Sequence, residues 1–302
     1  MKINLVTFNH IVPGAKDIRN IDDQIKIIIK VFSELQIDLK ITNMLDPNTL
    51  NILIEGFDES HVNVINKFCI KYNKKICVIM TEHLSLKNDE LYYGTFSLTN
   101  RDYIKNIDQR VFSLLSLSEN IMSYFTLGEL PLLSDIQKIL FTNEVYRINY
   151  PKIKPCYDVD FTQASYDIGF TGNIIPYREQ VIQELQKKYK VFKSKIVSSN
   201  DERLINTRKS KAIISIPQSE EWEWISPMRF MYNLEIGMPS VHLGKGDNTE
   251  FYNKILSWVS IDEAIQNPKI VYEKQIKVYN NLDLHSDRFK SFLDIWNILE
   301  ND

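Results

Sequence analysis

Residues 166–185 read YDIGFTGNIIPYREQVIQEL, and the fold of the second half of the chain is decided there. The segment reads as a strand, a glycine turn and a helix. Gly169 and Gly172 flank the turn, and residues without a Cβ let backbone amides come close to a bound anion. The N-terminus of the following helix adds a partial positive charge. The turn therefore predicts a phosphate site, with purely structural glycines as the alternative.

Arg178 lies just inside the helix expected over 177–188. Its planar guanidinium can bind a phosphate through two donors. Val181 and Ile182 stand three and four positions further on, so no acidic residue on its own helical face explains the arginine. The alternative is a solvated helix residue. No GxGxxG dinucleotide fingerprint is present.

A second strand, loop and helix follow in residues 212–244, which read AIISIPQSEEWEWISPMRFMYNLEIGMPSVHLG. Ser226 is a suitable N-cap, and the proline after it suits the first helical position. The loop 218–225 leaves the carboxyl end of a strand, where open α/β sheets bind ligands. Glu223 and the neighbouring tryptophans can hold a base, ribose or sugar, or the tryptophans can simply be buried. Arg229, in the first helical turn, can face the site or pair with Glu223.

The loop 243–248, LGKGDN, follows the last strand of this half. Lys245 is a candidate second cation near a diphosphate. A plain turn into the next helix explains the loop as well.

Short apolar strands alternate with helical patterns along the chain, which indicates α/β folding with parallel sheets. Strands are expected over 3–8, 39–44, 51–56, 75–81, 121–125, 167–171, 189–192, 212–216 and 240–243. Residues 91–101 are expected to be irregular. Residues 145–159 contain Pro151 and Pro155 and are expected to link two domains. We therefore expect two Rossmann-like domains facing across a cleft, 1–152 and 153–285, with 286–302 as a C-terminal helix that packs back on the first.

The charge, the cysteine content and the lengths of the apolar runs exclude several classes of protein. Lys and Arg total 36 against 39 Asp and Glu, a net charge of -3, so no broad basic field attracts nucleic acid. Three cysteines without CxxC spacing argue against a disulfide framework and a zinc site. The apolar runs are too short to span a membrane. These features predict a cytoplasmic protein, and peripheral contact with the inner membrane surface stays open.

DIGFTGNIIPYRE at 167–179 and SPMRFMYNLEIGMPSV at 226–241 together resemble the carboxyl-terminal, donor-binding domain of GT-B glycosyltransferases. The likeness is to the bacterial group with an F-x-G turn, a following arginine and an S-P-x-R helix, and it covers residues 166–244. It implies a nucleotide-sugar held between two Rossmann-like domains, with no bound metal or other cofactor. By position, the implied phosphate and donor residues are Thr171, Gly172, Arg178, Ser226, Pro227 and Arg229.

One position departs from the family pattern. Many members carry a glutamate three residues after the motif arginine, whereas this chain has Tyr232. Glu223 or Glu235 is a possible substitute.

Inverting members place a base in the first domain, and two strand ends offer candidates for it. His10 follows the first strand, while Glu82 and His83 follow the strand over 75–81. A histidine near neutral pKa, or a carboxylate whose pKa burial raises, can take a proton from a hydroxyl.

The resemblance and the residues together predict a metal-independent glycosyltransferase of polysaccharide biosynthesis. Its partners would be a nucleotide-sugar donor, bound by the second domain, and a glycan or glycolipid acceptor, bound by the first. Two alternatives remain open: a nucleotide-sugar epimerase or hydrolase on the same fold, and a non-catalytic subunit that binds a glycan or a protein.

Overall fold

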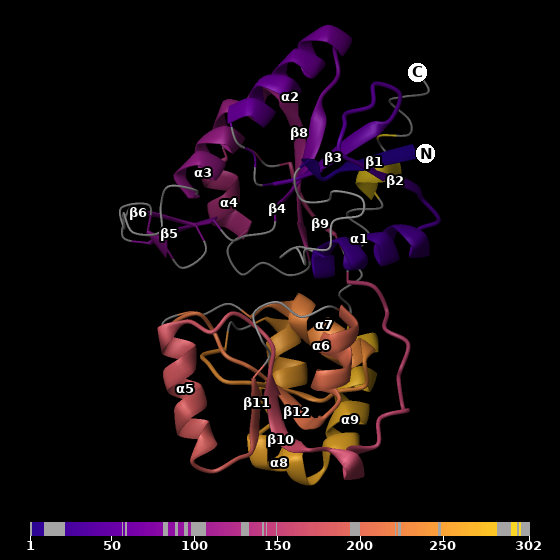
Figure 1. The fold of residues 1–302 in the computed structure, drawn as a ribbon. Coiled ribbons are helices and arrows are strands. Elements are labelled where there is room, and N and C mark those ends of the chain that lie inside the picture. Colours follow the sequence, from indigo (N-terminus) through magenta and orange to yellow (C-terminus); the bar gives the residue numbers. More distant parts are fainter. Residues whose placement is uncertain are drawn as a thin grey trace. The chain divides into compact units, whose positions relative to one another are not determined.

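The chain forms two compact units in the computed structural model (Figure 1). Unit 1 comprises Met1–Pro151 and Leu284–Asp302, and unit 2 comprises Lys152–Asp283. The structure describes residues 2–8, 22–55, 57, 59–80, 84–87, 90–93, 96–97, 107–127, 133–140, 142, 144–148, 150–193, 200–220, 222, 225–246, 249–282, 291–294 and 296.

Unit 1 is built on a six-stranded parallel sheet. From edge to edge its strands are β2 Asp38–Thr42, β1 Lys2–Val6, β3 Leu50–Ile54, β4 Ile76–Met80, β8 Ile121–Leu127 and β9 Val145–Ile148. Its helices are α1 Asp22–Glu34, α2 Glu59–Tyr72, α3 Ile107–Ser116 and α4 Leu133–Ile139. The chain runs from β1 to β2 in one direction and from β3 to β4 in the other. Because such crossovers are right-handed, α1 and α2 cover opposite faces of the sheet.

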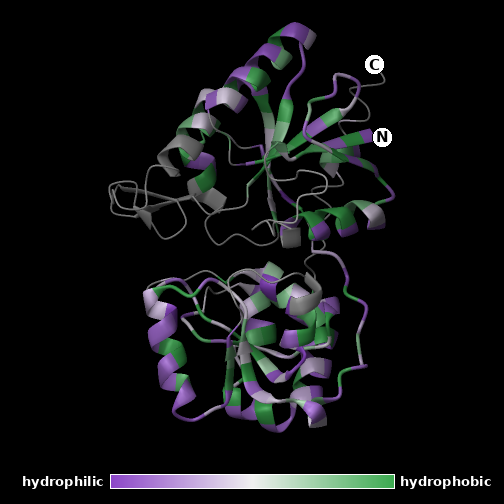
Figure 2. Cartoon of the chain, viewed as in Figure 1, coloured by the Kyte–Doolittle hydropathy of each residue, from purple (hydrophilic) through white to green (hydrophobic). Residues whose placement is uncertain are grey.

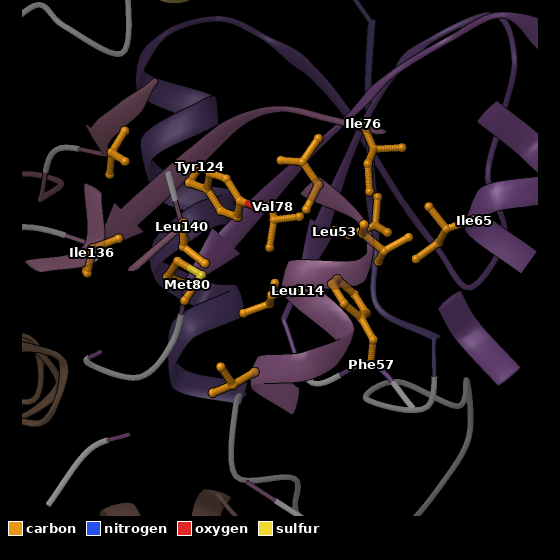
Figure 3. Packing of buried hydrophobic residues seen from close by; sticks show 14 of the residues in the cluster. Leu53, Phe57, Ile65, Ile76, Val78, Met80, Leu114, Tyr124, Ile136 and Leu140 are labelled. Atoms are coloured by element: carbon orange, nitrogen blue, oxygen red, sulfur yellow. The ribbon is translucent and has the colours of Figure 1, made fainter. Parts of the chain in front are cut away.

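The core on the α2 face joins the sheet to three helices (Figure 3). Leu53 and Val78 come from neighbouring central strands, and both are fully buried. Ile65 of α2, Leu114 of α3 and Ile136 of α4 pack into the same cluster. Burying such apolar side chains gains roughly 25 cal/mol for each Å² removed from water, so this face stabilises unit 1 strongly.

The opposite face of the same sheet receives the C-terminal segment. Successive residues of a strand point to opposite faces, so Ile79 lies on the side away from Val78. Phe125, paired with Ile79 in the parallel register, shares that side. The ring of Phe292 lies 5.1 Å from that of Phe125 and 5.2 Å from that of Tyr146. The chain therefore returns to unit 1 after passing through unit 2.

Unit 2 carries a four-stranded parallel sheet. Its strands in spatial order are β11 Val191–Lys193, β10 Tyr166–Phe170, β12 Ser210–Ser215 and β13 Ser240–His242. Its helices are α5 Pro176–Gln186, α6 Asn200–Thr207, α7 Pro227–Glu235, a π-helical turn Tyr252–Leu256, α8 Ile261–Gln266 and α9 Pro268–Asn280. Figure 2 shows apolar residues concentrated in the strands and mixed with polar ones along the helices.

Helix α9 forms hydrogen bonds with the edge strand β13. Gln275 of that helix is fully buried. Its Oε1 accepts from the backbone N–H of Ser240 at 2.9 Å, and its Nε2 donates to the Ser240 carbonyl at 2.8 Å. The amide side chain thus pairs with a strand edge as a neighbouring strand would.

The expected α/β class with two separate parallel sheets is confirmed. Two expectations about local structure are wrong. The interval 91–101 is not wholly irregular, because β5 Leu84–Lys87, β6 Glu90–Tyr93 and β7 Phe96–Ser97 form a small antiparallel sheet. The interval that begins at Val145 is not all linker, because β9 pairs with β8 and extends the sheet of unit 1.

Candidate functional site

The strand order of unit 2 marks where a ligand can bind. The chain leaves β10 toward β11 on one side, and β12 pairs with β10 on the other side. The strand order thus reverses between β10 and β12, and open α/β sheets bind ligands outside the carboxyl ends of the strands at such a switch point. Residues 171–175 and 216–226 follow these two strands. We call them together the β10–β12 edge.

Two sequence-predicted residues meet at this edge. A Cβ placed on Gly172 would lie 3.4 Å from Nη2 of Arg229 and 3.1 Å from Cζ of Phe170. Arg229 belongs to the first turn of α7, 57 positions further along the chain than Gly172. The sheet therefore brings a guanidinium directly over the glycine turn. Such a pairing of cation and bare backbone suits an anionic ligand.

Arg178 lies against the end of β12. The interpretation as an exposed helix residue is wrong, because the side chain is only 6% exposed. Its Nε donates to the carbonyls of Ile216 at 3.0 Å and Pro217 at 3.1 Å, and Nη1 donates to that of Asn173 at 3.0 Å. The guanidinium also lies 5.6 Å from the ring centre of Phe170. Arg178 thus ties the turn after β10 to the end of β12, and its role as a phosphate ligand stays a prediction.

The burial of Arg178 follows from its place on α5. Ile182, one helical turn further on, is fully buried in the core of unit 2. Residues four apart share a helix face, so Arg178 points toward the sheet beside Ile182. There its Nε donates to the carbonyls of Ile216 and Pro217, which directly follow the last residue of β12.

Two helices begin at this edge, and each starts with proline. Ile175 is the N-cap of α5 and Ser226 the N-cap of α7, and neither side chain accepts a hydrogen bond from the first turn. Proline at the first position removes one donor that would otherwise need a partner. The remaining first-turn amides and the positive ends of both helices face the same edge of the sheet. Thr171, half-buried, lies directly before Gly172 in the turn.

The loop after β13 lies next to the β10–β12 edge. A Cβ on Gly244 would lie 3.0 Å from Cγ of Pro217 and 2.9 Å from Nε2 of His242. The same His242 nitrogen lies 3.2 Å from the carbonyl oxygen of Lys245. Lys245 is exposed and directly follows Gly244 in this loop.

Other residues considered from the sequence lie elsewhere. Tyr232, at the position of the family glutamate, stacks with Arg203, whose guanidinium lies 4.1 Å from the ring centre. Asp158 binds Arg208, and Asp160 caps a short helical turn through Thr162. Glu223 lies outside the described residues.

Unit 1 has its own switch point, between β1 and β3. Phe8, just after β1, has a φ of 39°, which is rare for a residue with a side chain. Its ring lies 4.6 Å from that of His61 in α2. Strained backbone of this kind gathers at functional sites. The three base candidates, His10, Glu82 and His83, lie outside the described residues.

Glu55 was not anticipated from the sequence. It follows the last residue of β3 and is fully buried. A carboxylate seldom occupies such a position for packing alone, because burying its charge costs free energy. The available signal was an acidic residue directly after the mostly apolar segment LNILI, at the end of a strand beside the switch point.

Within the part of the chain that the structure describes, no group of three or more His, Cys, Asp or Glu residues could hold a metal ion. The same described residues contain no helix with the length and apolar character needed to cross a membrane.

Comparison with known proteins adds a similarity to solved structures. No protein-family model matches the sequence, and no curated protein matches it. Among solved structures, the chain is similar to the crystal structure of T4 phage BGT in complex with its UDP-glucose substrate, with a TM-score of 0.48, 14% sequence identity and 96% of each chain covered.

Proposed function

We propose that the chain is a glycosyltransferase that uses a nucleotide-sugar donor bound at the β10–β12 edge. The acceptor is a hydroxyl of a glycan or glycolipid, and the reaction needs no divalent metal. The observation that carries the proposal is the meeting of Arg229 with the Gly172 turn, 3.4 Å from the position of a Cβ there. A diphosphate between them would contact backbone amides on one side and a guanidinium on the other.

The positively charged groups at the β10–β12 edge would stabilise the departing diphosphate more than the intact donor. In the transfer, the acceptor oxygen forms a bond to the anomeric carbon while the bond from that carbon to the diphosphate oxygen breaks. The electron pair of the broken bond stays on the diphosphate, so negative charge grows there. Arg229, the helix N-termini and exposed Lys245 would offset this charge, and preorganised donors of this kind usually contribute several kcal/mol.

Arg178 would act on the donor indirectly. Its bonds to the carbonyls of Asn173 and Ile216 hold both loops of the edge in one arrangement. A fixed arrangement lowers the reorganisation that binding and transfer require. We therefore treat Arg178 as a positioning residue.

The acceptor proton needs a base if the reaction inverts the anomeric carbon. Within unit 1 we propose His10, Glu82 or His83, which follow β1 and β4 in the sequence. Glu55 is a fourth candidate, because it is a buried carboxylate next to the switch point of that sheet. Substituting each in turn would identify the base by a loss of turnover without loss of donor affinity.

The proposal that no metal is needed is supported by the binding partners of two aspartates. Asp158 and Asp160 spell the DxD pattern found in many metal-dependent transferases, yet each is engaged locally, with Arg208 and with Thr162. The charge of the diphosphate would instead be met by arginine and lysine.

The test measures release of nucleoside diphosphate from UDP-glucose, ADP-glucose and GDP-mannose, with and without a mixture of glycan acceptors. A transferase releases diphosphate faster when the acceptor is present, and a chelator leaves that rate unchanged. Equal release without acceptor would indicate a hydrolase, and loss on chelation would contradict metal independence. No release and no binding of any of the three donors would overturn the proposal.

A further inference from the structure

A groove of about 540 Å³ runs along α5 in unit 2, and its apolar lining residues are half-buried against the core of that unit. Tyr189 and Ile261 border it at the end of α5, and Glu220 borders it near the end of β12. Its volume falls within the roughly 300–1,000 Å³ of small-molecule sites. The groove borders the β10–β12 edge at Glu220, whereas Gly172, Arg178 and Arg229 are not among the residues that line it.

The groove is lined by two parallel rows of side chains, each spaced four residues apart. The first row is apolar and has an aromatic ring at each end: Tyr177, Val181, Leu185 and Tyr189. The second row is polar: Gln180, Glu184 and Lys188. Four-residue spacing aligns the members of each row that lie in α5, and Lys188 and Tyr189 follow the end of the helix at Gln186. The helical part of the apolar row, from 177 to 185, extends about 12 Å, longer than a single sugar ring.

The charges in the groove do not favour a phosphate. Its lysine, Lys188, donates to both carboxylate oxygens of Asp262, at 2.8 and 3.1 Å. Glu184 and Glu220 place two carboxylates on the lining, and both oxygens of Glu184 accept from the Lys187 ammonium at 2.7 Å. Carboxylates and amides are acceptors that suit the hydroxyls of a neutral ligand.

The two tyrosines at the ends of the apolar row have different surroundings. The Tyr189 hydroxyl donates to Asp262 at 2.9 Å, and the Lys188 ammonium lies 4.9 Å from the ring centre. Burial, and then the negative charge of Glu220, raise the pKa of Tyr177. The Tyr177 phenol therefore stays protonated at neutral pH, with an apolar ring and a polar end.

We propose that this groove binds a neutral oligosaccharide. The apolar row lies against the C–H face of the sugar rings, and Gln180, Glu184 and Glu220 bind their hydroxyls. The site is a second saccharide site that borders the donor site at Glu220, and its occupation does not depend on the proposed transferase activity.

The test titrates the full chain with maltotetraose, cellotetraose and N-acetylchitotetraose, in the absence of any nucleotide, by calorimetry. We expect at least one to bind with a dissociation constant tighter than about 1 mM. Gln180→Ala should weaken that binding about 2- to 12-fold, and Glu220→Ala about 10- to 150-fold, the values for a neutral and a charged hydrogen bond.

Gln183→Ala is the matched control. This glutamine is on the same helix, is exposed and lies outside the groove. Its replacement should leave oligosaccharide affinity unchanged. The proposal is overturned if none of the three probes binds, or if binding survives both groove substitutions. It is also overturned if sedimentation shows a dimer that Glu220→Ala dissociates, because the groove is then a contact between copies. Since no donor is present, a failure here leaves the donor-site proposal standing.

Discussion

Replacing Arg178 by alanine should destabilise unit 2 strongly, although the residue stands near a helix N-terminus. The change removes two donor groups, Nε and Nη1, which together reach the carbonyls of Ile216, Pro217 and Asn173. A hydrogen bond from a charged group contributes about 1.5 to 3 kcal/mol, so two donors give about 3 to 6 kcal/mol. An exposed arginine would change the free energy of unfolding by at most about 0.5 kcal/mol.

The assay is urea denaturation followed by tryptophan fluorescence. Three of the four tryptophans, Trp222, Trp224 and Trp258, fall within the range of unit 2, so the signal reports mainly on that unit. With a slope of about 1 to 3 kcal/mol per molar urea, the midpoint should fall by at least about 1 M. Arg178→Lys should recover only part of the loss, because an ammonium lacks the planar fork.

Gln183→Ala, an exposed change on the same helix, sets the background for this experiment. If the midpoint of Arg178→Ala equals that of Gln183→Ala, the hydrogen bonds to the two loops do not stabilise unit 2. The reasoning about Arg178 as a positioning residue would then fail as well.

Three further changes test separate parts of the structure. Gly172→Ala should weaken nucleotide binding at least about 10-fold in calorimetry, because the new methyl lies 3.4 Å from Nη2 of Arg229. The same change should alter the free energy of unfolding by less than about 1 kcal/mol. Gly237→Ala should lower the urea midpoint by an amount equal to about 1 to 2 kcal/mol, since φ is +81° and the methyl would lie 2.9 Å from the Cys156 carbonyl oxygen; an unchanged midpoint would refute this. Burial raises the pKa of Tyr124 to about 12, so the folded state keeps a proton that the unfolded state loses above pH 10. The stability of unit 1 should therefore fall between pH 10 and 12, by up to about 2.7 kcal/mol, and Tyr124→Phe should reduce that fall.

The strands of the two sheets and the starts of the helices beside them could be predicted from the sequence. The run ICVIM at 76–80 is apolar throughout, and β4 is buried between β3 and β8 as such a run requires. Pro227 after Ser226 marks the start of α7 at the residue where the helix begins. These features are local, so a single chain segment suffices to predict them.

The features that the sequence did not predict depend on partners far along the chain. Because its own helix face offers no acid, Arg178 was interpreted as a phosphate ligand or else as a solvated residue, yet its acceptors include backbone carbonyls 38 and 39 positions further on. The strand β9 was hidden in a proline-containing interval, because the β8 edge that pairs with it specifies it more than its four residues do. Such tertiary pairings leave no periodic signal in one sequence.

The central claim is that a nucleotide-sugar binds at the β10–β12 edge through Arg229. The direct measurement is calorimetric titration of UDP-glucose, ADP-glucose and GDP-mannose into the wild-type chain, Arg229→Ala and Lys209→Ala. Lys209 is an exposed cation directly before β12, at the amino end of that strand and so at the opposite edge of the sheet. We expect Arg229→Ala to raise the dissociation constant of the bound nucleotide about 10- to 150-fold and Lys209→Ala to leave it unchanged. Wild-type affinity in Arg229→Ala, or no binding of any of the three nucleotides to the wild-type chain, would contradict the claim.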